Sequence, residues 1–140
     1  MQPPVEVSAG LVFRDGFLLI SQRPPKSHLA GLWEFPGGKR ELQESWEQCL
    51  RRELHEELGC KVQVGQLYRD VVYEYPEKTV HLKFFICVLE PGEVPKAIGC
   101  SAVRWATPTD LQVNLFPPAD AALLKALTSD LSLWKPVARE

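Results

Sequence analysis

Residues 45–58 carry the strongest structural signal in the chain, because they have a marked helix start, a helical apolar stripe and a marked helix end. Ser45 and Gln48 fit a capping box, in which each side chain bonds the backbone N–H of the other residue. Gly59 stands where a helix usually ends on a left-handed residue. Leucines at helical spacing lie between these ends, so the helix must bury one face against another layer.

Three glutamates, Glu53, Glu56 and Glu57, border this apolar stripe. Their three- and four-residue steps bring them together on the helix surface, where like charges repel by about 0.2–0.5 kcal/mol per pair. The negative end of the helix dipole disfavours them further. Local stability therefore does not explain these acids, whereas Mg²⁺ or Mn²⁺ would, since both ions take carboxylate oxygens. A solvated acidic face is the alternative interpretation.

The segment Pro36-Gly37-Gly38 precedes this helix and is a strong breaker, which predicts a turn. Glycines there let the backbone approach a metal ion or a phosphate more closely than side chains would allow. An acidic helix directed at a glycine turn favours metal-assisted phosphoryl chemistry over surface decoration.

The rest of the chain predicts one α/β domain with a mixed sheet, without repeats or linkers. We expect this domain over residues 1–127 and a loosely ordered tail over residues 128–140. Expected strands lie at 5–13, 17–22, 32–35, 62–73, 80–89 and 102–105, and further helices begin at Thr107 and extend over 117–127.

Charge and apolar content exclude several classes of protein. The 16 Lys+Arg against 18 Asp+Glu give a net charge of −2, without the basic excess of a duplex nucleic-acid binder. No apolar run approaches the roughly 20 residues that span a bilayer, and the first residues lack a signal-peptide layout. The four cysteines have no zinc spacing, which favours free thiols and a cytoplasmic protein. We expect neither a membrane nor stable nucleic-acid binding; monomer and dimer both stay open.

The stretch from Gly38 to Cys60 resembles the Nudix box. Its fixed positions match at Gly38, Glu44, Arg52-Glu53-Leu54, Glu56-Glu57 and Gly59, and Cys60 replaces a bulky aliphatic residue. The resemblance extends over Val5 to Leu127 and is closest to MutT-like members. The segments that carry it are Gln22-Arg23, Leu32 to Lys39, Tyr73 to Pro76 and Phe116 to Asp120.

The resemblance implies an α/β/α sandwich around a mixed sheet and a metal-dependent hydrolysis of nucleoside triphosphates to a nucleoside monophosphate and pyrophosphate. It also implies Mg²⁺ as cofactor, with Mn²⁺ as an alternative. Glu53, Glu56, Glu57 and the Gly37 carbonyl would hold the metal, and Glu53 would activate the attacking water.

The resemblance assigns supporting roles to three further residues. Glu44 would be an auxiliary metal group, and Arg52 would orient the carboxylates by charge-assisted hydrogen bonds. Lys39 would stabilise charge on the diphosphate, although a solvated loop lysine is an equal alternative. One position departs from the family pattern: many MutT-like proteins have a glutamate where this chain has Gly99. Glu93 lies in the same loop and is a candidate replacement.

The base pocket implied by the resemblance contains Arg23, Phe35, Tyr75, Lys78 and Asp120, and Glu34 would accept a bond from a sugar hydroxyl. Phe35 and Tyr75 are stacking candidates that core packing would also explain. An ionised Asp120 only accepts hydrogen bonds, which suits guanine or the cytosine amino group. Asp120 is also typical of a first helical turn.

We therefore favour 8-oxo-dGTP or a related purine nucleotide as substrate. CTP or a modified dCTP is the alternative. A non-catalytic Nudix module that only recognises a base is an alternative of another class, but such a module has no need of Glu53, Glu56 and Glu57.

Overall fold

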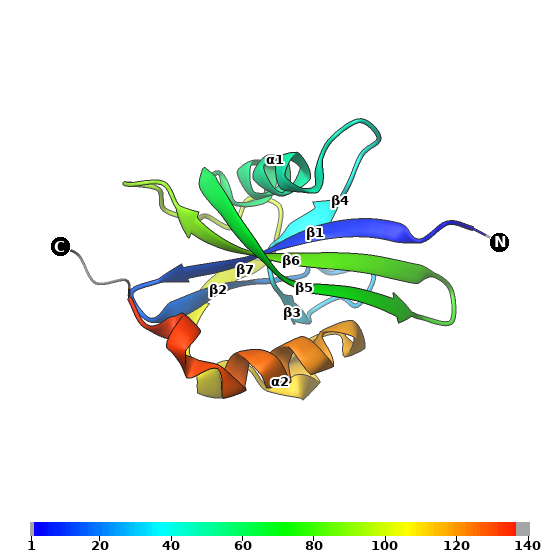
Figure 1. The fold of residues 1–140 in the computed structure, drawn as a ribbon. Helices are drawn as coiled ribbons and strands as arrows, with labels where there is room; N and C mark the ends of the chain where they lie inside the picture. The colour runs from blue at the N-terminus through cyan, green and yellow to red at the C-terminus, as the bar shows by residue number, and fades with distance from the viewer. Residues whose placement is uncertain (1, 137–140) are drawn as a thin grey trace.

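The computed structural model describes residues 2–136, which form one mixed sheet with a helix on each face (Figure 1). The strands are β1 (Val5–Arg14), β2 (Phe17–Gln22), β3 (Trp33–Glu34), β4 (Gly37–Lys39), β5 (Val62–Glu74), β6 (Thr79–Leu89) and β7 (Ala102–Ala106). The helices are α1 (Trp46–Leu58) and α2 (Ala121–Ser129), and 3₁₀ turns lie at Pro108–Asp110, Val113–Leu115, Pro118–Asp120 and Leu131–Trp134. The expected α/β/α sandwich is confirmed.

The sheet is built around β1, in the order β3-β2-β1-β6-β5. β1 runs parallel to β6 and antiparallel to β2 and β4, so the sheet is mixed. Asp15 and Gly16 have φ values of 53° and 85° in the β1–β2 turn, as a two-residue hairpin turn requires. No helix within residues 2–136 is both long and apolar enough to cross a membrane.

The Pro-Gly-Gly segment before α1 is not the expected turn, because its glycines belong to strand β4. β4 pairs with β1 so closely that a Cβ on Gly37 would lie 1.9 Å from the Ser8 carbonyl oxygen. A Cβ on Gly38 would lie 2.2 Å from the carboxyl carbon of Glu53. The glycines therefore allow β4 to fit between the backbone of β1 and the acidic helix.

The helix α1 has the predicted ends. The Ser45 hydroxyl accepts a hydrogen bond from the Gln48 N–H at 3.0 Å, and the Ser45 N–H donates to the Gln48 side chain at 2.8 Å. Gly59 ends the helix in the left-handed region at φ 64°. One cluster between α1 and the sheet buries the leucine stripe and the Cys60 thiol; its members include Val12, Leu19, Leu50, Leu54, Leu58, Cys60 and Phe85.

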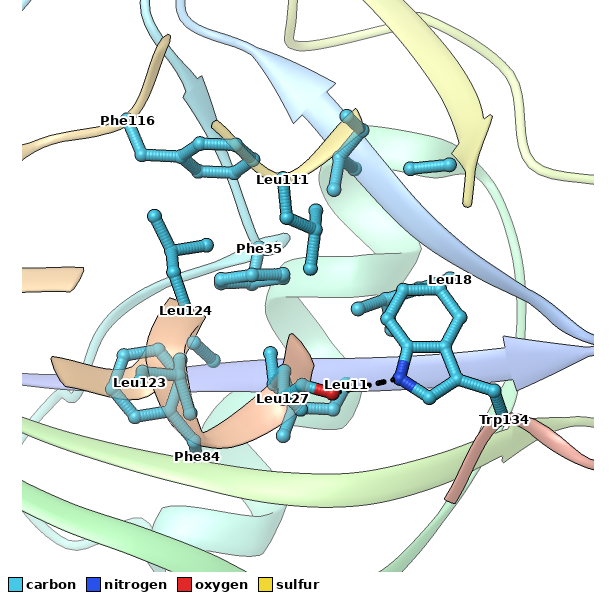
Figure 2. Packing of buried hydrophobic residues seen from close by; sticks show 13 residues of the cluster. Leu11, Leu18, Phe35, Phe84, Leu111, Phe116, Leu123, Leu124, Leu127 and Trp134 are labelled. Atoms are coloured by element: carbon cyan, nitrogen blue, oxygen red, sulfur yellow. Dashed lines mark hydrogen bonds between the residues drawn. The ribbon is translucent and has the colours of Figure 1, made fainter. Parts of the chain in front are cut away.

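The other face of the sheet packs against α2 through a second cluster (Figure 2). Trp134 belongs to this cluster: it is 5% exposed, meets the Phe13 ring edge-on at 5.5 Å, and donates its indole N–H to the Leu127 carbonyl at 3.0 Å. The expected loose tail is therefore wrong for residues 128–134, because the packed chain continues beyond residue 127. Residues 137–140 of that tail lie outside the described residues.

Candidate active site

Arg52 connects the acids of α1 to one another and to β4. Its Nε and Nη2 donate to the two oxygens of Glu44 at 3.0 and 2.6 Å, in a bidentate pair. Its Nη1 donates to Glu53 at 3.0 Å and to Glu56 at 3.3 Å, and Nη2 also donates to the Lys39 carbonyl at 3.0 Å. A planar guanidinium makes such divergent bonds and a lysine does not. This geometry is what an orienting role of Arg52 requires.

Glu44 fixes Arg52 in place. Its hydrogen bond with Arg52, with a second bond from the Glu41 backbone N–H, lowers the Glu44 pKa to about 2. The carboxylate therefore stays ionised throughout the neutral range. Both of its oxygens accept these bonds, so Glu44 supports the site through Arg52.

Glu53 and Glu57 are the two helix acids that the fold buries most. The Glu53 side chain is 15% exposed and lies against Gly38; burial raises its pKa, and Arg52 partly offsets this. Glu57 has its Oε2 buried without a hydrogen-bond partner among the described residues. Burial, followed by the charges of Glu34 and Glu53, raises the Glu57 pKa to about 8. A nearby positive charge is what would stabilise the ionised form of these groups.

The glutamates of α1 have the oxygen ligands that a divalent cation prefers, but their carboxylates do not point at one common position. Within residues 2–136 no three His, Cys, Asp or Glu side chains lie close enough together to hold a metal ion. Arg52 holds Glu53 and Glu56, and like charges keep the carboxylates apart. Hard oxygen donors and the unpartnered Oε2 of Glu57 nevertheless fit Mg²⁺ or Mn²⁺. The residues therefore fit such a cation.

A pocket beside β4 brings together all the expected base-pocket residues. Its lining includes Arg23, Glu34, Phe35, Gly37, Gly38, Lys39, Tyr75, Lys78 and Asp120. The acids of α1 do not line this pocket. Gly38 does line it, and the Glu53 carboxylate packs against Gly38. Glycine strand β4 is thus shared by the acidic helix and the pocket.

Arg23 and Glu34 form an ion pair within this pocket, with Nη1 and Oε2 2.9 Å apart. Burial raises the Glu34 pKa, and Arg23 partly offsets the effect. The charge of Glu34 in turn raises the pKa values of both Glu57 and Asp120. Glu34 therefore links the acidic helix electrostatically to the base end of the pocket.

The aromatic candidates have different positions. Phe35 is 3% exposed and stacks on Phe116 at 5.5 Å, so it is a core residue that also forms part of the pocket wall. Tyr75 is half-buried in the turn closed by mutual backbone bonds with Lys78. His28, whose ring meets Tyr75 edge-on at 5.5 Å, also lines the pocket. The sequence analysis did not select His28, because no other ligating or catalytic residue stands at a characteristic sequence spacing from this single loop histidine.

Asp120 is 6% exposed at the wall of the pocket. Burial, followed by the charge of Glu34, raises its pKa to about 7. The expectation of a carboxylate that only accepts hydrogen bonds is therefore incomplete. Near neutral pH both forms are populated, and the protonated form donates one bond and accepts others.

This shift predicts a pH dependence of stability that Asp120→Asn removes. The folded protein keeps the Asp120 proton up to about pH 7, whereas the unfolded chain releases it near pH 4. Because the folded state then binds more protons, the Asp120 contribution to the free energy of unfolding falls as the pH rises from about 4 to about 7. We expect the variant to gain stability relative to wild type over this range, by up to about 4 kcal/mol. Urea unfolding across these pH values measures the difference, and a constant difference would contradict the prediction.

Gly99 lies directly on the acidic helix. Its N–H donates to the Glu57 carbonyl at 2.9 Å, and a Cβ there would lie 3.3 Å from the Glu57 Cα. This loop thus reaches the site but brings no carboxylate at position 99. The other candidate in this loop, Glu93, lines a different groove, where its backbone carbonyl accepts a hydrogen bond from Arg14 at 2.8 Å.

Comparison with known proteins identifies the family. Residues 8–126 match the family model described as NUDIX domain. An Escherichia coli K12 protein named CTP pyrophosphohydrolase is 39% identical over 122 residues, which are 87% of this chain and 90% of the relative. A Proteus vulgaris protein named 8-oxo-dGTP diphosphatase is 38% identical over 71% of this chain and 89% of its own length.

Solved structures agree with these relatives. The E. coli ORF135 protein is 38% identical with a TM-score of 0.76, covering 92% of this chain and 91% of that one. The DNA mismatch repair protein MutT of methicillin-resistant Staphylococcus aureus 252 is 30% identical with a TM-score of 0.73, covering 93% and 99%. The resemblance to MutT-like members is confirmed. The chain belongs to the Nudix hydrolase family.

Proposed function

We propose that this protein hydrolyses nucleoside triphosphates to a nucleoside monophosphate and pyrophosphate, with 8-oxo-dGTP or a related purine nucleotide as substrate. One observation carries the proposal: the pocket that contains Asp120 and the Arg23–Glu34 pair also contains β4, and β4 packs against Glu53. In this proposal the pocket would hold the base, and β4 at its wall would lie between the pocket and the acids that hold the diphosphate. Such an enzyme would remove oxidised nucleotides from the pool used for DNA synthesis.

At the diphosphate end, Glu53, Glu56, Glu57 and the Gly37 carbonyl would hold Mg²⁺, with Mn²⁺ as an alternative. A bound cation would neutralise diphosphate charge and make an attacking water more acidic. Glu53 would accept the proton of that water, since burial raises its pKa and so makes its carboxylate a stronger base.

Two cationic side chains complete this end of the site. Arg52 keeps Glu53 and Glu56 in place through the bonds described above. Lys39 is exposed at the pocket and would neutralise charge that grows on the leaving pyrophosphate.

At the base end, the protonation state of Asp120 determines which base edge it fits. The ionised carboxylate accepts two bonds, which suits the N1–H and amino group of guanine. The protonated form donates one bond and accepts one, and this pattern suits the cytosine edge as well as the O6 and N1–H of guanine. Guanine thus makes two hydrogen bonds with either form of Asp120, whereas cytosine makes two with the protonated form and only one, from its amino group, with the ionised form.

CTP is the second candidate substrate, supported by the 39% identity to the E. coli CTP pyrophosphohydrolase. The two candidates differ in their expected pH dependence. Above about pH 7 the kcat/KM for CTP should fall relative to that for 8-oxo-dGTP, because Asp120 then loses the proton that it would donate to cytosine N3.

A hydrolysis panel tests the proposal. It contains 8-oxo-dGTP, dGTP, CTP, 5-methyl-dCTP and a dinucleoside polyphosphate, each with Mg²⁺ and with Mn²⁺, on both sides of pH 7. The highest kcat/KM with 8-oxo-dGTP and release of pyrophosphate would support it. Release of orthophosphate would contradict the proposed cleavage position. No turnover on any compound would favour a base-recognition module instead.

A further inference from the structure

Two buried oxygen atoms near α1 lack a hydrogen-bond partner among the described residues: the Ser21 hydroxyl and Oε2 of Glu57. Ser21 is fully buried, at 0% exposure. A buried polar atom without a partner costs free energy, and native proteins satisfy roughly nine in ten of such groups. Two unsatisfied atoms in one region therefore call for a joint physical explanation.

Strand alternation directs the Ser21 side chain towards α1. Leu19, two residues earlier on β2, belongs to the cluster that α1 covers. Val103, directly opposite Ser21 on β7, packs against the same cluster. Directly opposed residues of an antiparallel pair share a face, so Ser21 also lies on the α1 side of the sheet.

Glu34 connects Glu57 to this place, because the charge of Glu34 raises the pKa of Glu57. On β3, Glu34 lies directly opposite Ser21, so their Cβ atoms are about 4.5–5.5 Å apart on this face. The segment before β7 makes a second connection, because Gly99 donates its N–H to the Glu57 carbonyl and Ser101 donates its N–H to the Gln22 carbonyl, both at 2.9 Å. A three-residue segment thus joins the Glu57 backbone to the neighbour of Ser21.

We propose that Ser21 is a positioning residue for Glu57: once the divalent cation is bound, the Ser21 hydroxyl donates, directly or through one buried water, the hydrogen bond that orients the Glu57 carboxylate. This inference rests on the proposed function, in which Glu57 binds that cation. A hydroxyl suits the role because it stabilises a carboxylate without adding a positive charge that would repel the metal. Arg52, by contrast, makes no bond to Glu57 among the described residues.

The proposal predicts opposite effects of Ser21→Ala on metal binding and on stability. Loss of a supporting hydrogen bond of this kind weakens metal affinity by 10–100-fold, so we expect a Kd for Mn²⁺ about tenfold higher. The metal-free protein should keep its Tm or gain about 3 °C, because an unsatisfied buried hydroxyl is removed. A purely structural serine would lower Tm instead.

Matched variants separate the hydroxyl from the volume of the side chain. Ser21→Thr keeps the hydroxyl and should bind Mn²⁺ nearly as wild type, whereas Ser21→Val has the same shape without it and should bind like Ser21→Ala. Ser8→Ala is the stability control, because the equally buried Ser8 hydroxyl donates to the Trp46 carbonyl at 2.8 Å. Loss of this satisfied bond should lower Tm.

The experiment measures Mn²⁺ binding by electron paramagnetic resonance and Tm by calorimetry on the full chain, including Glu57→Gln and the double variant with Ser21→Ala. We expect Glu57→Gln to weaken Mn²⁺ binding and Ser21→Ala to add little in that background. If Glu57→Gln leaves the Kd unchanged, the metal role of Glu57 is wrong and the role of Ser21 falls with it. If Glu57→Gln weakens Mn²⁺ binding but Ser21→Ala leaves the Kd unchanged, the role of Ser21 is wrong and that of Glu57 stands. The same holds if Ser21→Ala has its full effect on the Kd in the double variant.

Discussion

Glu53→Gln is expected to lower kcat for pyrophosphate release by about 10³–10⁴-fold with Mg²⁺. Glutamine has nearly the same shape and can still accept the 3.0 Å hydrogen bond from Arg52. It cannot take a proton from water, however, and it gives a cation a neutral ligand in place of a charged one. The loss should therefore appear in kcat while the fold persists.

Stability separates this loss of chemistry from a loss of structure. Burial raises the Glu53 pKa, so its ionised form is disfavoured in the folded protein. The neutral glutamine should leave the metal-free protein at least as stable as wild type. Measurement of Tm without metal, beside kcat at saturating substrate, tests both expectations.

Two other glutamates of α1 provide graded controls. Glu56 is 56% exposed and accepts a hydrogen bond from the same arginine, Arg52, as Glu53 does. Glu56→Gln should therefore lower kcat by about tenfold. Glu47 is exposed in the first turn, away from β4, so Glu47→Gln should leave kcat within about twofold. The proposed role of Glu53 is wrong if Glu53→Gln loses less activity than Glu56→Gln.

The sequence predicts α1 so well because its signals are local. The Ser45–Gln48 box and Gly59 act within one turn of the helix ends, and the apolar period states which face is buried. Such features need no knowledge of distant residues, and all of them are confirmed.

The errors concern features that distant residues decide. In isolation Pro36-Gly37-Gly38 favours a turn, and only the approach of β1 and Glu53 explains why glycines form a strand. Trp134 follows a polar segment that predicts a tail, and its burial depends on Phe13, far away in the sequence. Nothing in the local sequence predicts that the Ser21 hydroxyl is buried without a hydrogen-bond partner among the described residues.

The candidate site shows the same division. The box motif indicated which acids and which arginine belong to the site, and the structure brings Glu44, Glu53 and Glu56 together around Arg52. The protonation of Asp120 could not be predicted, because a pKa of about 7 results from burial and from the charge of Glu34 on β3, far away in the sequence. The motif therefore indicates the reaction, whereas tertiary burial sets the chemistry of the base pocket.

The two glycines of β4 should respond to alanine in opposite ways. At Gly37 the new Cβ would meet only backbone of β1, with the Ser8 carbonyl oxygen at 1.9 Å, and backbone cannot move aside. We expect Gly37→Ala to lower the free energy of unfolding by about 3 kcal/mol or more. Gly10→Ala on β1 is the control, because its Cβ would meet side chains at 3.5 Å or beyond, and it should cost no more than about 1 kcal/mol.

At Gly38 the new Cβ would meet only the carboxylate of Glu53, at 2.2–2.5 Å. A carboxylate at the end of a flexible side chain can swing away, so Gly38→Ala should cost no more than about 1 kcal/mol of stability. It should nevertheless lower kcat by about 10²-fold, because the displaced Glu53 no longer lies against β4. Urea unfolding and steady-state kinetics on the same samples measure both effects. If the loss acts through Glu53, adding Gly38→Ala to Glu53→Gln should reduce kcat little further, and full additivity of the two losses would refute this mechanism.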